Sequence, residues 1–493
     1  LDVQKTILNI HYPESESLKS QAIHRVFFDR LLRVQLFSLM NRQSYQANKK
    51  TSSEAQQWGV LKTMLQRLPV ELTMDQKKVI KQIIDDFHSG KPMLRLLQGD
   101  VGSGKTIVAT LAAYYLKQTE QGQTVFLAPL EVLAQQHYQS IAKLLLPLGL
   151  RVELLTGSLT KGQKEKIKSD LQQGKIDVII GTHALLQEGI SFQNLQYVII
   201  DEQHKFGVKQ RAFFKKFGAP HILQMSATPI PRSMAIAFFG EFDVSIIDEL
   251  PKGRLPIQTK IISSTEEKKL KPRILEKIRK NQKLFVVTPL IQESESLDEV
   301  QSVLHAYEEI QLLYPELEGK IGLLHGKMKP KEKEEAMQNF KSGKTMILVA
   351  TTVIEVGVDV PEATVMIIKN AERFGLAQLH QLRGRIGRSD LQSYCFLQTP
   401  KKSGDSYERL RAMEQTTDGF KLAELDLQNR GSGEILGTMQ SGISDIPIEI
   451  LSDLKFLEQV QAGASWLLQK YPDLEGLPSL QKFLHEKIGD ILA

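Results

Sequence analysis

Residues 94–106 read LRLLQGDVGSGKT, and this stretch decides how the first half of the chain is expected to fold. The apolar run Leu94–Leu97 leads into Gly99–Thr106, which fits the phosphate-loop pattern of a glycine, four residues, then glycine, lysine and serine or threonine. The helix-prone stretch Ile107–Leu116 follows. A strand, a glycine-rich loop and a helix in this order let backbone N–H groups converge on phosphate oxygens. A chance match would lack this context, so we predict a nucleotide site.

Each residue of the loop pattern has an expected task in that site. The glycines Gly99, Gly102 and Gly104 let the backbone approach the phosphates closely. Lys105 is expected to reach the β- and γ-phosphates, and Thr106 to ligate Mg²⁺. The predicted cofactors are therefore ATP and Mg²⁺.

Short apolar runs alternate with helical periods on either side of the loop, from Leu72 to about Ile247. Continuous β-branched runs of this kind are typical of a parallel sheet that is covered on both faces. The expected strands are Met93–Leu97, Thr124–Ala128, Val152–Leu155, Asp177–Ile180, Tyr197–Ile200, Ile222–Met225 and Val244–Ile247.

A break rich in proline and glycine, Leu250–Pro256, separates this series from a second one. The second set of expected strands is Thr259–Ile262, Leu284–Val287, Ile321–Leu324, Met346–Val349, Val365–Ile368 and Tyr394–Leu397. We therefore predict an α/β fold with two tandem doubly wound parallel-sheet domains, a helical N-terminal linker and a C-terminal helical hairpin and tail. The expected boundaries are 1–71 for the linker, 72–250 and 251–400 for the two α/β domains, and 401–493 for the hairpin and tail.

Two carboxylates follow the expected strand Tyr197–Ile200, at the sheet edge where ligands of doubly wound folds collect. Asp201 is expected to hold the Mg²⁺, and Glu202 to polarise the attacking water as a general base. On its own, such a pair is more often the start of a solvated loop. The phosphate loop upstream reverses that preference in favour of a metal site.

Four further side chains are weaker candidates. Gln76 precedes an amphipathic helix, and its amide could recognise an adenine edge, although most such glutamines are solvated. Arg385 and Arg388 lie three apart, hence on one side of the segment if it is helical. They could stabilise a transferring phosphoryl group from across a cleft, or form a solvated or DNA-contacting face; neither reading is favoured by this pattern alone. Asp359 could meet a ribose hydroxyl.

The composition of the chain limits which partners, compartments and membrane segments are expected. The 493 residues carry a net charge of +6, which permits binding to a polyanion without demanding it. The single cysteine, Cys395, excludes an internal disulfide, suits a reducing cytosol and is expected to be a buried structural thiol. We expect no signal peptide and no membrane span, because no apolar run approaches ~20 residues. The chain begins at Leu1 rather than Met, so we expect a piece of a longer protein.

Taken together, the motifs resemble the core of superfamily 2 helicases, spanning roughly residues 72–400. The segments that carry the resemblance, in the order found in that superfamily, are Gln76, the phosphate loop, Ala128–Leu130, Thr156-Gly157, Gly181–His183, Asp201–His204, Ser226–Pro229, Thr288-Pro289, Thr352–Asp359 and Gln381–Arg388. The resemblance implies that both α/β domains are RecA-like.

Within that superfamily, the chain resembles the RecG family most closely. Asp201–Arg211 reads DEQHKFGVKQR, as in that family, and Leu427–Gly442 resembles the translocation motif that it shares with transcription-repair coupling factors. Ile10–Pro13 and the Arg25–Arg42 helix resemble the family's connector. The OB-fold wedge that precedes this connector in the family is absent from these 493 residues, so we expect the motor alone, without the element that selects the fork.

The resemblance also implies roles for individual residues. Lys105, Thr106, Asp201 and Glu202 would hydrolyse ATP with Mg²⁺, completed by Arg385 and Arg388, while Gln76 would recognise adenine. Ser226 and Thr228 would couple nucleotide state to domain movement. The nucleic-acid track would include Pro129, Thr156, Gly157, His183, Thr288 and Thr352. The functional positions of the translocation motif would be Arg409, Arg430 and Gln440.

The function implied is that of an ATP-dependent DNA helicase of the 3'-5' superfamily 2 type. It would translocate on duplex DNA and remodel stalled forks and Holliday junctions in repair and recombination. The implied partners are branched or duplex DNA and, as a candidate, single-stranded DNA-binding protein, with a monomer in the bacterial cytoplasm at the nucleoid. Two alternatives stay open: the motor of a transcription-repair coupling factor, and a DNA-binding switch that does not turn over ATP.

Overall fold

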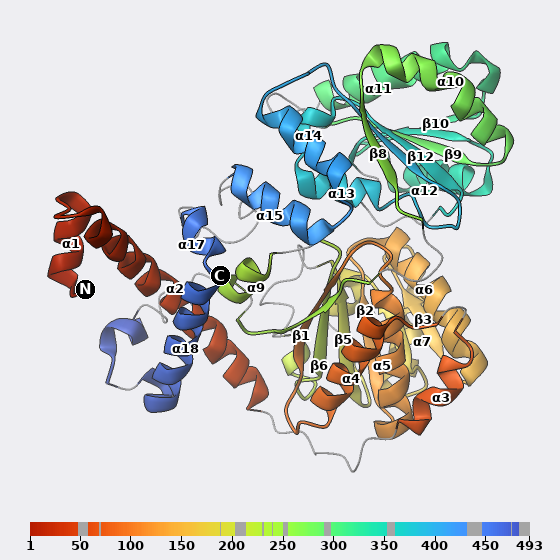
Figure 1. The fold of residues 1–493 in the computed structure, drawn as a ribbon. Coiled ribbons are helices and arrows are strands. Elements are labelled where there is room, and N and C mark those ends of the chain that lie inside the picture. The colour runs from red at the N-terminus through yellow and green to blue at the C-terminus, as the bar shows by residue number, and fades with distance from the viewer. Residues whose placement is uncertain are drawn as a thin grey trace.

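The computed structural model describes residues 1–47, 58–68, 71–187, 189–202, 213–228, 231–238, 240–249, 255–289, 297–352, 360–430, 446–474 and 476–482. Two α/β domains lie one above the other in Figure 1, and a long helical arm extends to one side. None of the helices in these ranges combines the length and apolarity that a bilayer crossing requires.

The first domain is built on a seven-stranded sheet of parallel strands in the order β3-β4-β2-β5-β6-β1-β7. Its strands are β1 (Leu94–Gly99), β2 (Gln123–Leu127), β3 (Val152–Leu155), β4 (Val178–Gly181), β5 (Leu195–Asp201), β6 (His221–Ser226) and β7 (Asp243–Ile247). The helices around it are α4 (Met74–Phe87), α5 (Lys105–Glu120), α6 (Glu131–Leu145), η1 (Leu146–Leu148), α7 (Lys161–Gln172), η2 (His183–Leu186) and α9 (Arg232–Phe238).

The second domain repeats the plan with a six-stranded parallel sheet in the order β10-β11-β9-β12-β13-β8. Its strands are β8 (Gln258–Ile262), β9 (Lys283–Val287), β10 (Ile321–Leu324), β11 (Ile347–Ala350), β12 (Ala363–Ile368) and β13 (Tyr394–Gln398). Its helices are α10 (Ser264–Arg279), α11 (Leu297–Leu313), η4 (Pro315–Leu317), α12 (Pro330–Ser342), η6 (Ala371–Arg373) and α13 (Leu376–Arg383).

Both sheets are sandwiched between helices because their strands are apolar on both faces. In β1, Leu96 and Leu97 are fully buried and pack into separate hydrophobic cores, as neighbouring side chains on opposite faces of a strand must. The second sheet is likewise covered by two cores, one containing Phe285 and the other Leu284 of the same strand, β9. Burial on both faces holds the strands in place, and the loops of the site begin at the ends of these strands.

Further helices come from both ends of the chain. They comprise α1 (Val3–His11), α2 (Glu16–Gln46), α3 (Gly59–Leu65), α14 (Asp405–Gln415), α15 (Gly419–Arg430), α17 (Ile448–Ser452), α18 (Leu454–Lys470) and η7 (Pro472–Leu474), of which α3, α14 and α15 lie against the α/β domains. Helices α1, α2, α17 and α18 form an arm beside the first domain. The long helix α2 packs against α18 and α9 (Figure 1). The buried Gln35 on α2 donates its Nε2 to the carbonyls of Ile236 and Ala237, at 2.6 and 2.9 Å.

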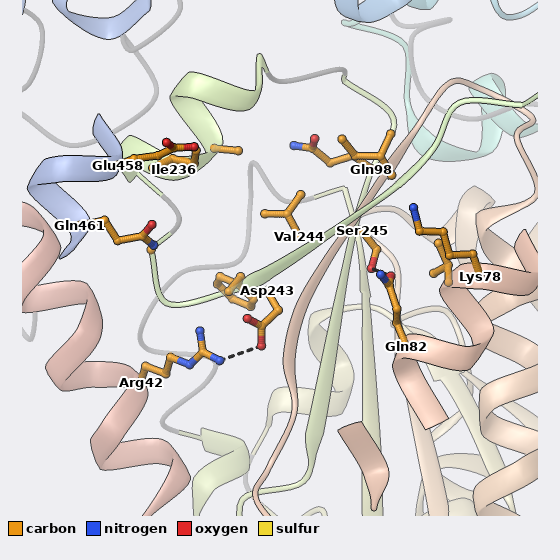
Figure 2. A pocket seen from close by; sticks show the side chains of 15 residues that line it. Arg42, Lys78, Gln82, Gln98, Ile236, Asp243, Val244, Ser245, Glu458 and Gln461 are labelled. Carbon is orange, nitrogen blue, oxygen red and sulfur yellow. Dashed lines mark hydrogen bonds and ion pairs between the residues drawn. The ribbon is translucent and has the colours of Figure 1, made fainter. Parts of the chain in front are cut away.

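A cavity of about 480 Å³ lies where this arm meets the first domain. Figure 2 shows the Arg42–Asp243 ion pair at its wall, with nitrogen and oxygen 2.7 Å apart, and Gln98 of β1 reaching into it. Among the described residues that line the cavity, none is a predicted site residue. This cavity is therefore distinct from the predicted nucleotide site.

The predicted fold class is confirmed, including both parallel sheets and the helical segments at both ends. Each expected strand matches an observed one to within a residue or two at either end, and Cys395 is buried in β13. Arg385 and Arg388 do not lie on a helix, so the prediction that they share one helical side is wrong. Helix α13 ends at Arg383, and Gly387 has a left-handed φ of 74°. The domain boundaries stay a prediction, and Gln440 and Asp359 lie outside the described residues.

Replacing Gln35 by alanine is expected to destabilise the protein by about 1–3 kcal/mol, because the carbonyls of Ile236 and Ala237 lose a buried donor. The exposed Gln43 on the same helix provides the control, since Gln43→Ala should change stability by less than about 0.5 kcal/mol. Urea denaturation followed by circular dichroism would compare the two. Equal midpoints for both variants would show that the Gln35 contacts do not anchor α2.

Candidate functional site

The phosphate loop connects β1 to α5 with the geometry that its glycines allow. Gly102 and Gly104 have φ values of 79° and 86°, in the left-handed region where a β-carbon is unfavourable. At Gly104 a β-carbon would also collide with the side-chain amide of Gln76. Gly104 is the N-cap of α5, so the first N–H groups of that helix point into the loop. The arrangement forms a cradle for an anion.

Lys105 is the buried charge of this cradle. Its side chain is 8% exposed, and Nζ donates to the carbonyls of Gly99 and Asp100 at 2.6 and 2.9 Å. Burial lowers the pKa of Lys105 to about 8, against the opposing influence of carboxylates that include Asp201 and Glu202. An ammonium held this way can exchange its loop carbonyls for phosphate oxygens, which are stronger, charged acceptors.

Asp201 and Glu202 lie at the carboxyl end of β5, close enough to influence Lys105. Burial alone would raise the pKa of Asp201, but a hydrogen bond with His137 and the charge of Lys105 hold it below its ordinary value. Glu202 has a φ of 56°, a left-handed conformation that is strained for a residue other than glycine. Such strain is commonly retained at functional sites.

The donor set fits Mg²⁺ bound together with a nucleotide. Among the described residues, no group of three or more metal-binding side chains occurs. Mg²⁺ usually keeps several waters and binds through one or two carboxylates plus substrate phosphates. Asp201 and the hydroxyl of Thr106, the second residue of α5, supply that kind of incomplete shell.

Gln76 lies against the phosphate loop rather than in solvent. It is 2% exposed; its Nε2 donates to the carbonyl of Ser103 at 2.8 Å, and its Oε1 accepts from the N–H of Thr73 at 2.9 Å. Thr73 in turn caps α4 through a reciprocal capping box with Gln76. Gln76 therefore joins the start of α4 to the loop, and adenine recognition by its amide stays a prediction.

The second domain contributes Arg385 to the same site. Arg385 is 4% exposed, and its guanidinium lies near enough to Lys105 to lower the pKa of that lysine further. The neighbouring Arg388 donates Nε to the carbonyl of Gly384 at 3.3 Å, and a β-carbon on Gly384 would lie 2.8 Å from Cβ of Val101 in the phosphate loop. The two domains thus meet at the loop itself.

A second link between the domains was not predicted. His380 on α13 donates Nε2–H to Oδ1 of Asp100 at 2.6 Å, and Arg383 donates to its Nδ1 at 3.0 Å. Arg383 also donates to the carbonyls of Thr416 and Thr417, at 2.9 and 3.0 Å, in the turn between α14 and α15. No local pattern marks these residues, because their partners are distant in sequence.

The predicted nucleic-acid and coupling residues lie at the carboxyl edges of the sheets. Ser226 ends β6, and its Oγ lies 2.7 Å from Oγ1 of Thr228. Some of these residues are exposed or half-buried: Gly157, His183, Thr228 and Thr352. The others are buried: Pro129, Thr156 and Thr288. Arg409 is on α14, Arg430 ends α15, and contact of any of these residues with DNA stays a prediction.

Both α/β domains match known helicase families. Residues 73–236 match the model of the DEAD/DEAH box helicase family, and residues 270–390 match the helicase conserved C-terminal domain. The chain is 44% identical to the ATP-dependent DNA helicase RecG of Streptococcus pneumoniae, over 93% of this chain and 68% of that protein. The chain belongs to the RecG family of ATP-dependent DNA helicases.

Other members of the family are similarly close. RecG of Synechocystis is 43% identical over 100% of this chain and 59% of its own length, and RecG of Aquifex aeolicus is 44% identical over 99% and 63%. The chain thus spans about three fifths of the length of these two relatives. The structure of RecG bound to a three-way DNA junction superposes with a TM-score of 0.79, at 39% identity, covering 94% of this chain and 59% of that chain.

Replacement of Lys105 by alanine is expected to reduce ATP turnover by about a thousandfold or more, because the charge predicted to contact the β- and γ-phosphates is lost. A steady-state phosphate-release assay would measure this loss, with thermal unfolding as the check on folding. Lys81, an exposed lysine of α4, serves as control, and Lys81→Ala should turn over ATP at the parental rate. Near-parental turnover by a folded Lys105→Ala protein would contradict the site assignment.

Proposed function

We propose that this chain is an ATP-driven motor that translocates on duplex DNA and remodels branched DNA, such as stalled forks and Holliday junctions. The observation that carries the proposal is the convergence of both domains on one buried lysine. Asp201 and Glu202 of the first domain and Arg385 of the second all act on Lys105. A site shared between two domains can change their separation whenever its ligand changes.

In the proposed reaction, Lys105 and the N–H groups at the start of α5 bind the phosphates, and Asp201 and Thr106 hold the metal. Mg²⁺ neutralises charge on the β- and γ-phosphate oxygens when it is bound. Glu202 orients the attacking water and accepts its proton, while Arg385 and Arg388 stabilise the charge that develops on the transferred phosphoryl group. Because these arginines come from the second domain, turnover requires the two domains to be close.

The link through His380 supports a mechanical role for the α14–α15 hairpin. Asp100 of the phosphate loop, His380 and Arg383 form one chain of hydrogen bonds that ends in the hairpin turn. Gly419 at the start of α15 is so close that a β-carbon there would lie 2.5 Å from both Asp100 Oδ1 and His380 Nε2. A shift of the phosphate loop would therefore move the hairpin, which leads into the predicted positions Arg430 and Gln440.

The substrate class rests on family membership and on the junction-bound relative. The proposal extends to a monomer in the bacterial cytoplasm, associated with the nucleoid, with single-stranded DNA-binding protein as a candidate partner. Membership of the RecG family argues against the coupling-factor alternative. The position of Arg385 and Glu202 near Lys105 argues against a switch without turnover.

If the motor holds DNA through its phosphates, affinity should fall steeply with salt and depend little on base sequence. Contact with about six or more phosphates predicts a loss of about a thousandfold between ~50 and ~200 mM salt. Fluorescence anisotropy with duplexes of unrelated sequence would measure this dependence. A strong preference for one sequence that persists at high salt would contradict a translocating motor.

Arg409→Ala is expected to uncouple ATP hydrolysis from movement. Arg409 donates to the carbonyl of Glu372 in η6 at 3.4 Å and thereby ties α14 to the second domain. The variant should keep DNA-stimulated ATP turnover within several-fold of the parental value but lose about tenfold in displacement of a third strand from duplex DNA.

The matched control is Arg411→Ala on the same helix, since Arg411 is half exposed and pairs only loosely with Glu408, at 3.5 Å. This variant should match the parental chain in both assays. Equal strand displacement by the two variants would show that α14 does not transmit force through Arg409. Parallel loss of turnover and displacement in Arg409→Ala would instead mark a defect in the ATPase site.

A further inference from the structure

His137 is a nearly buried histidine that lies outside the recognised motifs and contacts the predicted metal carboxylate. It is on α6, and its Nε2 lies 2.7 Å from Oδ2 of Asp201 at the end of β5. The two side chains are only 12% and 15% exposed. A carboxylate can only accept a hydrogen bond, so Nε2 carries the proton that it donates to Asp201.

Packing holds the imidazole ring in this position. The ring lies against Phe126 of β2, with the ring centroids 4.4 Å apart and the planes inclined by 40°. Phe126 is fully buried, and β2 pairs directly with β5, the strand that ends in Asp201. The ring, its donor atom and the carboxylate are therefore supported by two adjacent strands of one sheet.

We propose that His137 is a positioning residue for the magnesium carboxylate. Its hydrogen bond occupies Oδ2 of Asp201 and sets the rotation of the carboxylate that would contact hydrated Mg²⁺ on a bound nucleotide. The proposal rests on the proposed ATPase function, but it concerns this histidine alone.

The small number of protein ligands makes such positioning consequential. Mg²⁺ demands near-ideal octahedral geometry, and among the described residues few protein groups would hold it here, so the direction of one carboxylate would affect the whole shell. Groups that orient a metal ligand typically change metal affinity by about 10–100-fold when they are removed. A purely structural histidine would instead affect folding and leave metal affinity unchanged.

Two substitutions of His137 distinguish a positioning role from a purely structural one, because their side-chain amides differ in length. The amide nitrogen of glutamine extends about as far as Nε2 of histidine, whereas that of asparagine reaches only the Nδ1 position. His137→Gln should therefore preserve the bond to Asp201, and His137→Asn should lose it. His88 provides the matched control: its Nε2 lies 2.8 Å from the Tyr115 hydroxyl in the same domain, and neither residue is a predicted metal ligand.

The experiment measures Mn²⁺ binding to the full 493-residue chain in the presence of ADP, by electron paramagnetic resonance of free Mn²⁺. His137→Asn is expected to weaken Mn²⁺ binding by about 10–100-fold and to raise the Mg²⁺ concentration that half-saturates ATP turnover. His137→Gln and His88→Ala should stay close to the parental value. Binding of a fluorescent ADP analogue without metal should be the same for all variants.

Parental Mn²⁺ affinity in a folded His137→Asn protein would overturn the proposal and leave the ATPase function standing. Should the asparagine variant not fold, the glutamine variant decides the question, because weak Mn²⁺ binding by a folded His137→Gln protein also contradicts positioning through Nε2. If the parental chain itself shows no nucleotide-dependent Mn²⁺ binding, the proposed function is wrong and the role of His137 falls with it.

Discussion

The buried ammonium of Lys105 is the charge on which the arrangement of the site depends. With its pKa lowered to about 8 by burial, it is stable in place only because loop carbonyls accept its hydrogen bonds and carboxylates surround it. Two of those carboxylates, Asp201 and Glu202, lie at the carboxyl end of β5, and the glycines of the loop let the backbone turn around the lysine. The sheet order, which places β5 two strands from β1, brings them to one edge.

Both domains place charged groups around this lysine. The first domain supplies the cradle and the predicted metal carboxylate, but the guanidinium of Arg385 comes from the loop after α13 in the second domain. The contact of Gly384 with Val101 and the bond between His380 and Asp100 place that second domain directly on the loop. Arg383 continues the connection to the turn of the α14–α15 hairpin. A displacement of the phosphate loop would therefore be transmitted to helices outside both sheets.

Much of this was predictable from local sequence. Buried strands are continuous apolar runs in the sequence, so each expected strand could be placed from its own residues. The phosphate loop could be placed from its glycines and lysine. The contacts of His137 and His380 could not be predicted, because each joins residues far apart in the chain and has no periodic signal. The ends of helices also escaped prediction: α13 stops at Arg383, where the following Gly384 packs against the loop, so Arg385 is not helical.

The central claim, that one ATPase site is completed across the two domains, is tested most directly by Arg385→Ala. The measurement is ATP turnover with saturating duplex DNA, alongside ADP affinity by fluorescence. The account predicts a loss of turnover of about a thousandfold with ADP affinity nearly unchanged, since Arg385 acts on the transferring phosphoryl group rather than on the bound product. Turnover at the parental rate in the folded variant would contradict a site shared between the domains.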